Sequence, residues 1–406
     1  MEQQPSFEQQ PTPSAKGFEE KSAASLEPVK EHAPSPRVDS FKLPVPRPLE
    51  PDFRRNRLMA LATSPRKLLN YLKFKGRKKT IVVNYLPVQL DIEPVSRCNF
   101  HCTMCQVSDW PKYQRAADMP YDEFKKIIDS QYGLLEVKLQ GYGEPTLAKN
   151  TFFDMIAYAR KRHIWVRTTT NASLLHLHDN YKKLIDSGIN EVQISIDGAT
   201  KETFEKIRRG GKFERVLENC QMVNAYSAEK NVLRTRMWTT LQADNAHEFF
   251  QFLDVAKVMG FKRMTYSLNL HGFGQEKWIG SNKEINAIGD VTEEMANEAI
   301  ERGKKLGIEV TFWRATDKYS VESVDTLCAW PFERVFISSD LRIVPCCVIS
   351  NPDTADLGDA KDFMNQWNGP VFQEYRAAHL EGRIPNYCKE CYEHNGEKKS
   401  SLNIVE

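Results

Sequence analysis

Apolar and polar positions repeat with two different periods between residues 82 and 312 of this 406-residue chain. The runs Leu90–Val95 and Leu135–Gln140 have the length and composition of buried strands. Segments between such runs, for example Tyr121–Gln131 and Phe152–His163, place apolar residues three or four positions apart, which predicts helices with one buried face. Strand and helix alternate at intervals of about thirty residues, and this predicts parallel β/α units.

Six strands of this kind are expected before a cysteine-rich tail. They begin near Leu90, Leu135, Trp165, Val192, Leu233 and Lys262. Glycines at 188, 260 and 307 stand where the intervening helices are expected to stop. The predicted fold class is therefore α/β, with a partial (β/α)6 barrel over residues 81–315, and sites in β/α barrels lie at the carboxyl ends of the strands.

Three cysteines follow the first predicted strand in the spacing C-x3-C-x2-C: Cys98, Cys102 and Cys105. A structural zinc site needs four protein ligands, and a conventional four-iron cluster needs one thiolate for each iron. Three thiolates therefore leave one iron of such a cluster open to a small molecule. The spacing predicts a cluster that takes part in chemistry.

The second predicted strand ends in Gly141-Tyr142-Gly143-Glu144-Pro145. Together with the cysteine spacing, this motif resembles the radical S-adenosylmethionine (SAM) enzymes. The resemblance implies a [4Fe-4S] cluster whose open iron chelates SAM, and a reductive cleavage that gives methionine and a 5′-deoxyadenosyl radical. It also implies that Gly141, Gly143, Glu144 and Pro145 hold the methionine end of SAM; the alternative for Glu144 is a carboxylate that caps neighbouring amides. Glycine suits a backbone that must approach a ligand closely.

The same resemblance implies further contacts to SAM at the ends of later strands. Asn171 closes the strand that begins at Trp165, Ser195 lies on the strand Val192–Gly198, and both would contact the ribose. The residue before the third cluster cysteine is often aromatic in these enzymes and stacks near the adenine, but here it is Met104. A thioether can still pack on a ring, so adenine contact is assigned to Met104.

The tail holds five more cysteines, and alone they would suggest structural zinc. The closing pair Cys388-Lys389-Glu390-Cys391, with the segments around the other three, resembles the SPASM or twitch extension of radical SAM enzymes, placed at residues 324–400. The resemblance implies one auxiliary [4Fe-4S] cluster with the ligands Cys328, Cys346, Cys388 and Cys391, and leaves Cys347 spare. Cys220 lies in a helical segment and is expected to be a small buried hydrophobe.

The first eighty residues differ in composition from the rest. Residues 1–50 are rich in Gln, Pro, Ser and Glu, which predicts a disordered tail. Residues 51–80 carry ten Lys or Arg and one acid, Asp52, interleaved with leucines, which predicts a basic amphipathic helix. This helix either attaches to an acidic surface, whether anionic lipid, nucleic acid or an acidic partner, or packs as a solvated helix across the open end of the barrel.

Composition places the chain among cytoplasmic enzymes. The formal net charge is +2 and 41% of the residues are hydrophobic. No run approaches the roughly 20 apolar residues of a membrane helix, and the first thirty residues lack the apolar region of a secretory signal. Cysteines in cluster spacings indicate a reducing compartment. The predicted location is the cytoplasm, with peripheral attachment to a membrane through residues 51–80 as a variant.

We expect the protein to abstract a hydrogen atom from a small or sugar-like substrate and to complete a two-electron, dehydrogenase-type oxidation, with an external donor such as a flavodoxin or ferredoxin. A single auxiliary cluster suits this reaction because it could accept the second electron. The alternative is a maturase that modifies a ribosomally made peptide. A hypothesis of another class is a non-enzymatic metal-cluster protein that binds nucleic acid through residues 51–80. No catalytic side chain is assigned.

Overall fold

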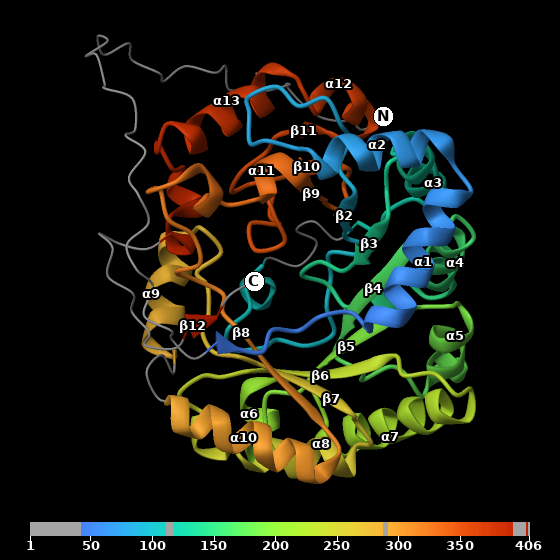
Figure 1. The fold of residues 1–406 in the computed structure, drawn as a ribbon. Coiled ribbons are helices and arrows are strands. Elements are labelled where there is room, and N and C mark those ends of the chain that lie inside the picture. The colour runs from blue at the N-terminus through green and yellow to red at the C-terminus, as the bar shows by residue number, and fades with distance from the viewer. Residues whose placement is uncertain (1–41, 111–116, 287–290, 393–402, 405–406) are drawn as a thin grey trace, which may run out of the picture. The chain divides into compact units, whose positions relative to one another are not determined.

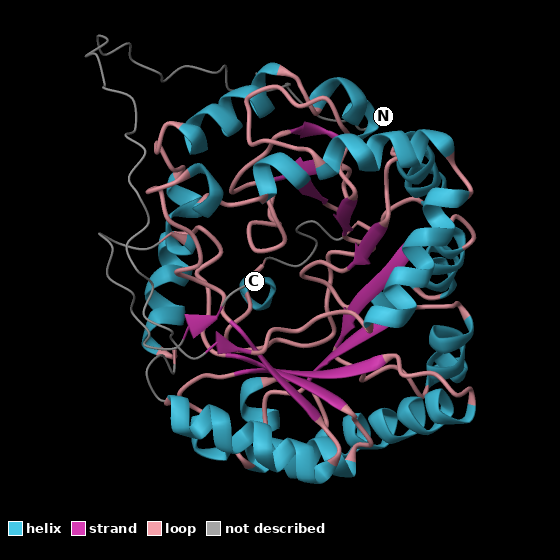
Figure 2. Ribbon diagram, in the orientation of Figure 1, coloured by secondary structure: helices cyan, strands magenta, loops and turns pink. Residues whose placement is uncertain are grey.

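The computed structural model describes residues 42–110, 117–286, 291–392 and 403–404. Within them, one ten-stranded sheet has the order β11-β10-β9-β2-β3-β4-β5-β6-β7-β8, and the eight strands from β9 to β8 run parallel. Figure 1 and Figure 2 show the sheet curving around, with helices on its outside. The strands are β2 (Gln89–Ile92), β3 (Glu136–Leu139), β4 (Trp165–Thr170), β5 (Glu191–Ser195), β6 (Thr235–Thr240), β7 (Arg263–Ser267), β8 (Glu309–Trp313), β9 (Arg334–Ile337), β10 (Arg342–Val344) and β11 (Gly358–Asp359).

The predicted partial barrel is confirmed, and its six expected strands are β2 to β7. Two further parallel strands were not among the six. β8 extends the sheet beyond β7, and β9, which comes from the cysteine-rich tail, pairs with β2. The tail is thereby joined to the barrel through a shared sheet. In the described residues the sheet ends at β8 and β11, so the barrel is open.

Helices connect the parallel strands and cover the outer face of the sheet (Figure 2). Their ends follow the sequence signals: the Thr200 side chain caps α6 by accepting from Thr203 N, and Gly307 ends α10 in the left-handed conformation that glycine adopts without cost. The helices of the barrel and tail are α3 (Tyr121–Ser130), α4 (Asn150–Arg160), α5 (Asn180–Asp186), α6 (Lys201–Ile207), α7 (Phe213–Glu229), α8 (Gln251–Val258), α9 (Glu276–Glu284), α10 (Glu293–Leu306), α11 (Trp330–Glu333), α12 (Phe363–Gln366) and α13 (Pro370–Leu380).

The two faces of the sheet differ in polarity because side chains alternate along each strand. The outer face is apolar and fully buried against the helices, as at Val137, Leu139 and Ile194. The inner face is polar. In one row across four neighbouring strands, the paired residues are Asp91, Lys138, Arg167 and Glu191, and further members of this face are Thr169, Gln193, Ser195, Trp238, Thr240, Ser267 and Trp313.

The segment before the barrel differs in part from the disordered tail that the sequence predicts. Most of the predicted disordered tail, residues 1–50, lies outside the described residues, but residues 42–49 are ordered against the barrel. Leu43 is buried, Phe312 N donates to Pro44 O at 2.8 Å, and Arg236 Nη2 donates to Arg47 O at 2.9 Å. The strand β1 (Lys42–Leu43) also pairs with β12 (Asn403–Ile404). Backbone pairing and buried hydrogen bonds therefore offset the weak hydrophobicity of these residues.

The single basic amphipathic helix expected over residues 51–80 is instead two helices, α1 (Glu50–Ala62) and α2 (Pro65–Lys75). Pro65 starts α2 because its fixed φ suits the first helical position, and the Ser64 side chain accepts from Lys67 N as the cap. Both helices pack on loops that precede strands. The Phe53 ring meets Trp165, the first residue of β4, edge to face at 5.2 Å, and Asn70 Nδ2 donates to Leu86 O before β2.

No helix in the described ranges combines the length and the apolar character that crossing a membrane requires.

Candidate functional site

The predicted cluster cysteines lie in a loop at the carboxyl end of β2, where a barrel fold places its chemistry. Backbone hydrogen bonds hold this loop on the segment after α6: His101 N donates to Arg209 O at 2.8 Å and Thr103 N to Ile207 O at 3.0 Å. Cys102 is buried, and Cys98 and Cys105 are half-buried. The structure brings the three thiols together, since each lies within the electrostatic reach of another.

Burial raises the pKa of the Cys98 thiol, and the neighbouring charges of Glu144, Cys105 and Cys102 raise it further. Three thiols in this setting stay protonated unless a metal takes their protons. The described residues hold no group of three His, Cys, Asp or Glu side chains tight enough for a single metal ion. Three thiolates would leave a structural zinc ion without its fourth protein ligand but can hold three irons of a four-iron cluster, so this donor set fits a cluster better than zinc.

The Gly141–Pro145 loop packs directly on the cysteine loop. A Cβ on Gly143 would lie 2.1 Å from Val95 O and 2.7 Å from Arg97 O, and Glu144 N donates to Arg97 O at 3.0 Å. Gly141 is equally confined, because a Cβ there would lie 2.2 Å from the Glu93 side chain. The glycines of this motif thus permit a close approach of two backbone segments.

Gly143→Ala is expected to displace the cysteine loop, because both clashing atoms are backbone oxygens that cannot rotate away. Of about eight irons in the reconstituted wild type, we expect the variant to lose up to about four, with the auxiliary cluster kept. Iron analysis checks this. Gly280→Ala is the matched control, since a Cβ on Gly280 meets nothing within 4 Å. Full iron content in Gly143→Ala would contradict the packing argument.

The Glu144 side chain is buried and accepts hydrogen bonds from its own loop and from the end of β4. Oε1 accepts from Thr146 N at 3.2 Å, from Thr146 Oγ1 at 2.6 Å and from Thr170 Oγ1 at 2.6 Å, while Oε2 accepts from Asn171 N at 2.7 Å. Burial raises the pKa of Glu144, and these hydrogen bonds lower it. The carboxylate ties the end of β3 to the end of β4, which is the capping alternative named above.

The other residues assigned to SAM lie at different distances from the triad. Asn171 touches the cysteine loop: its Nδ2 is 3.9 Å from Cys98 Sγ and 3.0 Å from Asn99 Oδ1. Ser195 ends β5 on the inner face, one strand further along and paired with Trp238. Met104 belongs to the cysteine loop and packs half-buried against the core. Pro145 is buried and begins a 3-10 turn, Pro145–Ala148.

A buried ion pair next to the cysteine loop was missed from the sequence. Arg208 Nη2 lies 2.5 Å from Asp197 Oδ2, and the Arg208 charge lowers the pKa of the Cys102 thiol against the larger effect of burial. A fixed cation here stabilises thiolates. The sequence signal for this ion pair was the run Arg208-Arg209-Gly210-Gly211, which follows a helix. In the structure this run packs on the cysteine loop, since a Cβ on Gly211 would lie 2.9 Å from the Phe100 ring.

Four of the five tail cysteines form a second group. Burial raises the pKa of Cys346, Cys388 and Cys391 well above the usual thiol value. The neighbouring charge of Cys328 raises the pKa of each of these thiols further. The charges that act most on Cys347 are those of Asp91, Lys138, Lys318 and Arg334. Cys347 therefore lies beside the inner face of the barrel and also next to Cys346, whose pKa it raises more than any other neighbouring charge does.

His271, which follows β7, contacts this second group and was also missed. Its Nε2 lies 3.5 Å from Cys391 Sγ, and its Nδ1 accepts from Phe273 N at 2.8 Å. The hydrogen bond from Phe273 N requires the tautomer with the proton on Nε2, which then points to the sulfur, whereas Glu390 Oε2, 3.2 Å from Nδ1, favours a proton on Nδ1. Burial lowers the pKa of His271 to about 3, which keeps the ring neutral.

His271→Phe is expected to lower the reduction potential of an auxiliary cluster. A hydrogen bond to a charged group is worth about 1.5 kcal/mol, and a one-electron couple moves by 59 mV for each factor of ten, so the expected change is about −60 mV. A redox titration followed by electron paramagnetic resonance measures it. His247→Phe, at an exposed site, is the control. An unchanged potential in His271→Phe would exclude this hydrogen bond.

Comparison with known proteins finds two matching domains. A family model described as "Radical SAM superfamily" matches residues 92–256, and one described as "Iron-sulfur cluster-binding domain" (SPASM) matches residues 328–392. Curated relatives include the GTP 3′,8-cyclase of Aliarcobacter butzleri, 30% identical over 52% of this chain and 63% of the relative, and the mycofactocin maturase MftC of Mycolicibacterium smegmatis, 28% identical over 47% of each chain. The chain thus spans about half to two thirds of these relatives.

A solved structure with the same fold is that of Streptococcus suis SuiB bound to precursor peptide SuiA. The TM-score is 0.55 at 16% identity, over 72% of this chain and 67% of SuiB. At that identity the likeness concerns the fold alone.

Proposed function

Since this chain is a radical SAM enzyme with a C-terminal SPASM iron–sulfur domain, we propose that it takes a hydrogen atom from a small, sugar-like substrate and oxidises it by two electrons. The two domains imply a SAM-binding [4Fe-4S] cluster, SAM and an auxiliary cluster. When bound, these groups supply the radical that takes the hydrogen atom and the acceptor for the remaining electron. The protein's own residues bind the substrate, orient it and accept a proton.

We assign the groups to residues as follows. The thiolates of Cys98, Cys102 and Cys105 would hold the SAM-binding cluster, and the loop Gly141–Pro145 with Met104, Asn171 and Ser195 would hold SAM. The auxiliary cluster would take Cys328, Cys346, Cys388 and Cys391. These assignments place the barrel at residues 81–315 and the auxiliary domain at 324–400.

The polar inner face of the sheet is the observation that supports the proposed oxidation. It lies between the triad loop, at the carboxyl end of β2, and Cys347, whose strongest neighbours are side chains of that face. Hydroxyl and amide groups at Thr169 and Gln193 match the hydroxyls of a sugar. The rings of Trp238 and Trp313, 5.6 Å apart, offer flat apolar surface for its C–H faces.

Lys138 is the side chain on this face best placed to accept the proton. It is half-buried, and the described residues include no hydrogen-bond or ion-pair partner for it. Burial first, and the Arg167 charge second, lower its pKa, so that a neutral amine becomes available nearer to neutral pH. The substrate carbon would lose a hydrogen atom to the radical, and its hydroxyl would lose a proton to Lys138. Removal of the remaining electron by the acceptor named above would then leave a carbonyl group.

The experiment uses reconstituted full-length enzyme, SAM and reductant with a small-molecule extract from cells grown in deuterated medium. The proposal expects deuterium in 5′-deoxyadenosine and a metabolite lighter by one pair of hydrogen atoms. Lys138→Met should lower formation of that product about 100-fold or more, the usual contribution of a general base, while 5′-deoxyadenosine still forms. Lys262→Met, at an exposed position, is the control. Equal product formation in Lys138→Met would remove Lys138 from the mechanism.

The second candidate is peptide modification, which the names of MftC and of the SuiB complex favour. It expects deuterium transfer from the peptide fraction of the extract and none from the small molecules. A non-enzymatic, nucleic-acid-binding protein would show no SAM cleavage with either fraction. One experiment therefore separates the three functions.

We also propose a cytoplasmic location and an external reductant such as a flavodoxin or ferredoxin. All nine cysteines are free thiols, which suits a reducing compartment. Attachment of residues 51–80 to an acidic surface is taken up below.

A further inference from the structure

Helices α1 and α2 present their large apolar side chains to solvent. Five of them are exposed: Leu58 by 65%, Leu69 by 60%, Leu72 by 58%, Met59 by 48% and Leu68 by 40%. The two helices follow one another and pack together, so these side chains belong to one continuous element. Single exposed leucines are common, but five on two adjoining helices form a patch that calls for a partner.

The buried sides of the same helices combine the apolar Ala60 and Phe74 with three polar side chains. Asn56 Nδ2 donates to His163 O at 2.8 Å, Lys67 Nζ to Arg162 O at 3.3 Å, and Asn70 Nδ2 to Leu86 O at 3.0 Å. These three side chains anchor the helices to loops of the barrel and fix which face points outward. The leucines at 58, 68, 69 and 72 are therefore left on the side that faces solvent.

Basic residues accompany the exposed leucines. The sequence from Phe53 to Lys75 contains no acid. Arg66, Leu69 and Leu72 lie three positions apart and so share one side of α2, next to Lys73. Among the described residues, Arg54, Arg66, Lys73 and Lys75 have no ion-pair partner within 4 Å. This surface, formed by Arg54, Arg66, Lys73 and Lys75 with the five exposed apolar residues, is called the basic apolar face.

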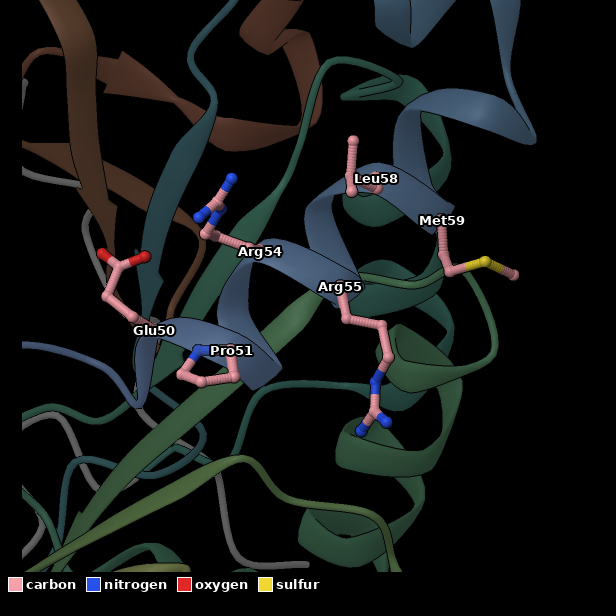
Figure 3. A pocket seen from close by; sticks show the side chains of 6 residues that line it. All are labelled: Glu50, Pro51, Arg54, Arg55, Leu58 and Met59. Carbon is pink, nitrogen blue, oxygen red and sulfur yellow. The ribbon is translucent and has the colours of Figure 1, made fainter.

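The outer side of α1 is also hollowed. Glu50, Pro51, Arg54, Arg55, Leu58 and Met59 line an open pocket of about 540 Å³. Figure 3 shows Arg54 and Arg55 extending in opposite directions from the helix, with Leu58 and Met59 one turn further along. Guanidinium groups beside aliphatic side chains suit a phosphate headgroup whose acyl chains lie nearby.

We propose that the basic apolar face docks the protein on an anionic lipid bilayer. Aliphatic side chains interleaved with unpaired cations match an interface of acyl chains and anionic headgroups. A second copy of the chain would bring like charges together across the contact, which disfavours a dimer. Nucleic acid would match the cations but not the leucines, since bases stack on aromatic rings.

The test is cosedimentation of the full-length protein with vesicles of phosphatidylcholine alone and with vesicles containing about one third phosphatidylserine, at low and physiological salt. We expect binding only to the anionic vesicles, weakened by salt. Leu69→Gln/Leu72→Gln should lower the partition coefficient at least about tenfold, because both side chains would insert. Arg66→Gln/Lys73→Gln should lower it about 25-fold, at about fivefold for each cation.

Val258→Gln is the matched control, because Val258 is also an exposed aliphatic residue, on α8. It should bind like the wild type. Each variant is first checked by circular dichroism and iron content, which the exposed substitutions should leave unchanged. Absence of wild-type binding to anionic vesicles would overturn the proposal. So would a dimer that the leucine variants dissociate, or nucleic-acid binding that only the charge variant weakens. SAM cleavage in solution should be unaffected, so this result is independent of the proposed reaction.

Discussion

Replacing Cys98, Cys102 and Cys105 together with alanine is expected to abolish SAM cleavage and to leave the auxiliary site loaded. The triad loop supplies all three thiols that follow β2 in the chain, and their loss leaves the SAM-binding cluster without its proposed ligands. Iron should fall from about eight to about four per chain, on the stoichiometry of two four-iron clusters. Iron and acid-labile sulfide analysis with low-temperature electron paramagnetic resonance, with and without SAM, measures both effects.

Cys220→Ala is the control for loss of a thiol as such. Cys220 is fully buried in the core, as predicted, and it lies in α7 away from both cysteine groups. The control should keep all its iron and lose some stability. Zinc in place of iron, or a wild-type signal that SAM does not alter, would overturn the assignment of the triad.

The second large effect is expected from neighbouring cysteines. Cys346→Ala should lose the auxiliary cluster, about four irons, because Cys346 shares its surroundings with Cys328 and Cys391. Cys347→Ala should keep it, because Cys347 lies among charges of the inner face. Substrate oxidation should disappear in Cys346→Ala, while uncoupled SAM cleavage continues. Each variant is the other's control, and the reverse pattern would make Cys347 the ligand.

Local motifs explain why much of the site could be predicted. The triad and the Gly-Glu-Pro motif each occupy a few consecutive residues at a strand end, and parallel strands put their carboxyl ends on one side of a sheet. Local hydrophobic runs in the same way predicted the six strands from β2 to β7. The pairing of β9 with β2 could not be read in this way, because those strands lie more than two hundred positions apart in the chain.

Contacts between distant segments account for the other omissions. Asp197, which follows β5, meets Arg208, which follows α6, beside the triad, and His271 meets Cys391 across 120 positions of the chain. The helix expected over residues 51–80 is divided at Ser64 and Pro65, which is a local signal, but the side of each helix that faces the barrel could not be predicted from the pattern. Hydrophobic periodicity assumes that leucines face the protein, but here loop carbonyls face α1 and α2, and asparagine satisfies them.

The anchors of α1 and α2 have a directional consequence. They contact the loops that precede β2 and β4, at the amino ends of the strands, whereas the triad and its companion loop stand at the carboxyl ends. In a molecule adsorbed through these helices, the carboxyl ends of the strands, where the triad lies, would therefore face the aqueous phase. Its reactants would arrive by diffusion from the aqueous phase, so adsorption would concentrate the catalyst at a boundary without requiring the substrate to be a lipid.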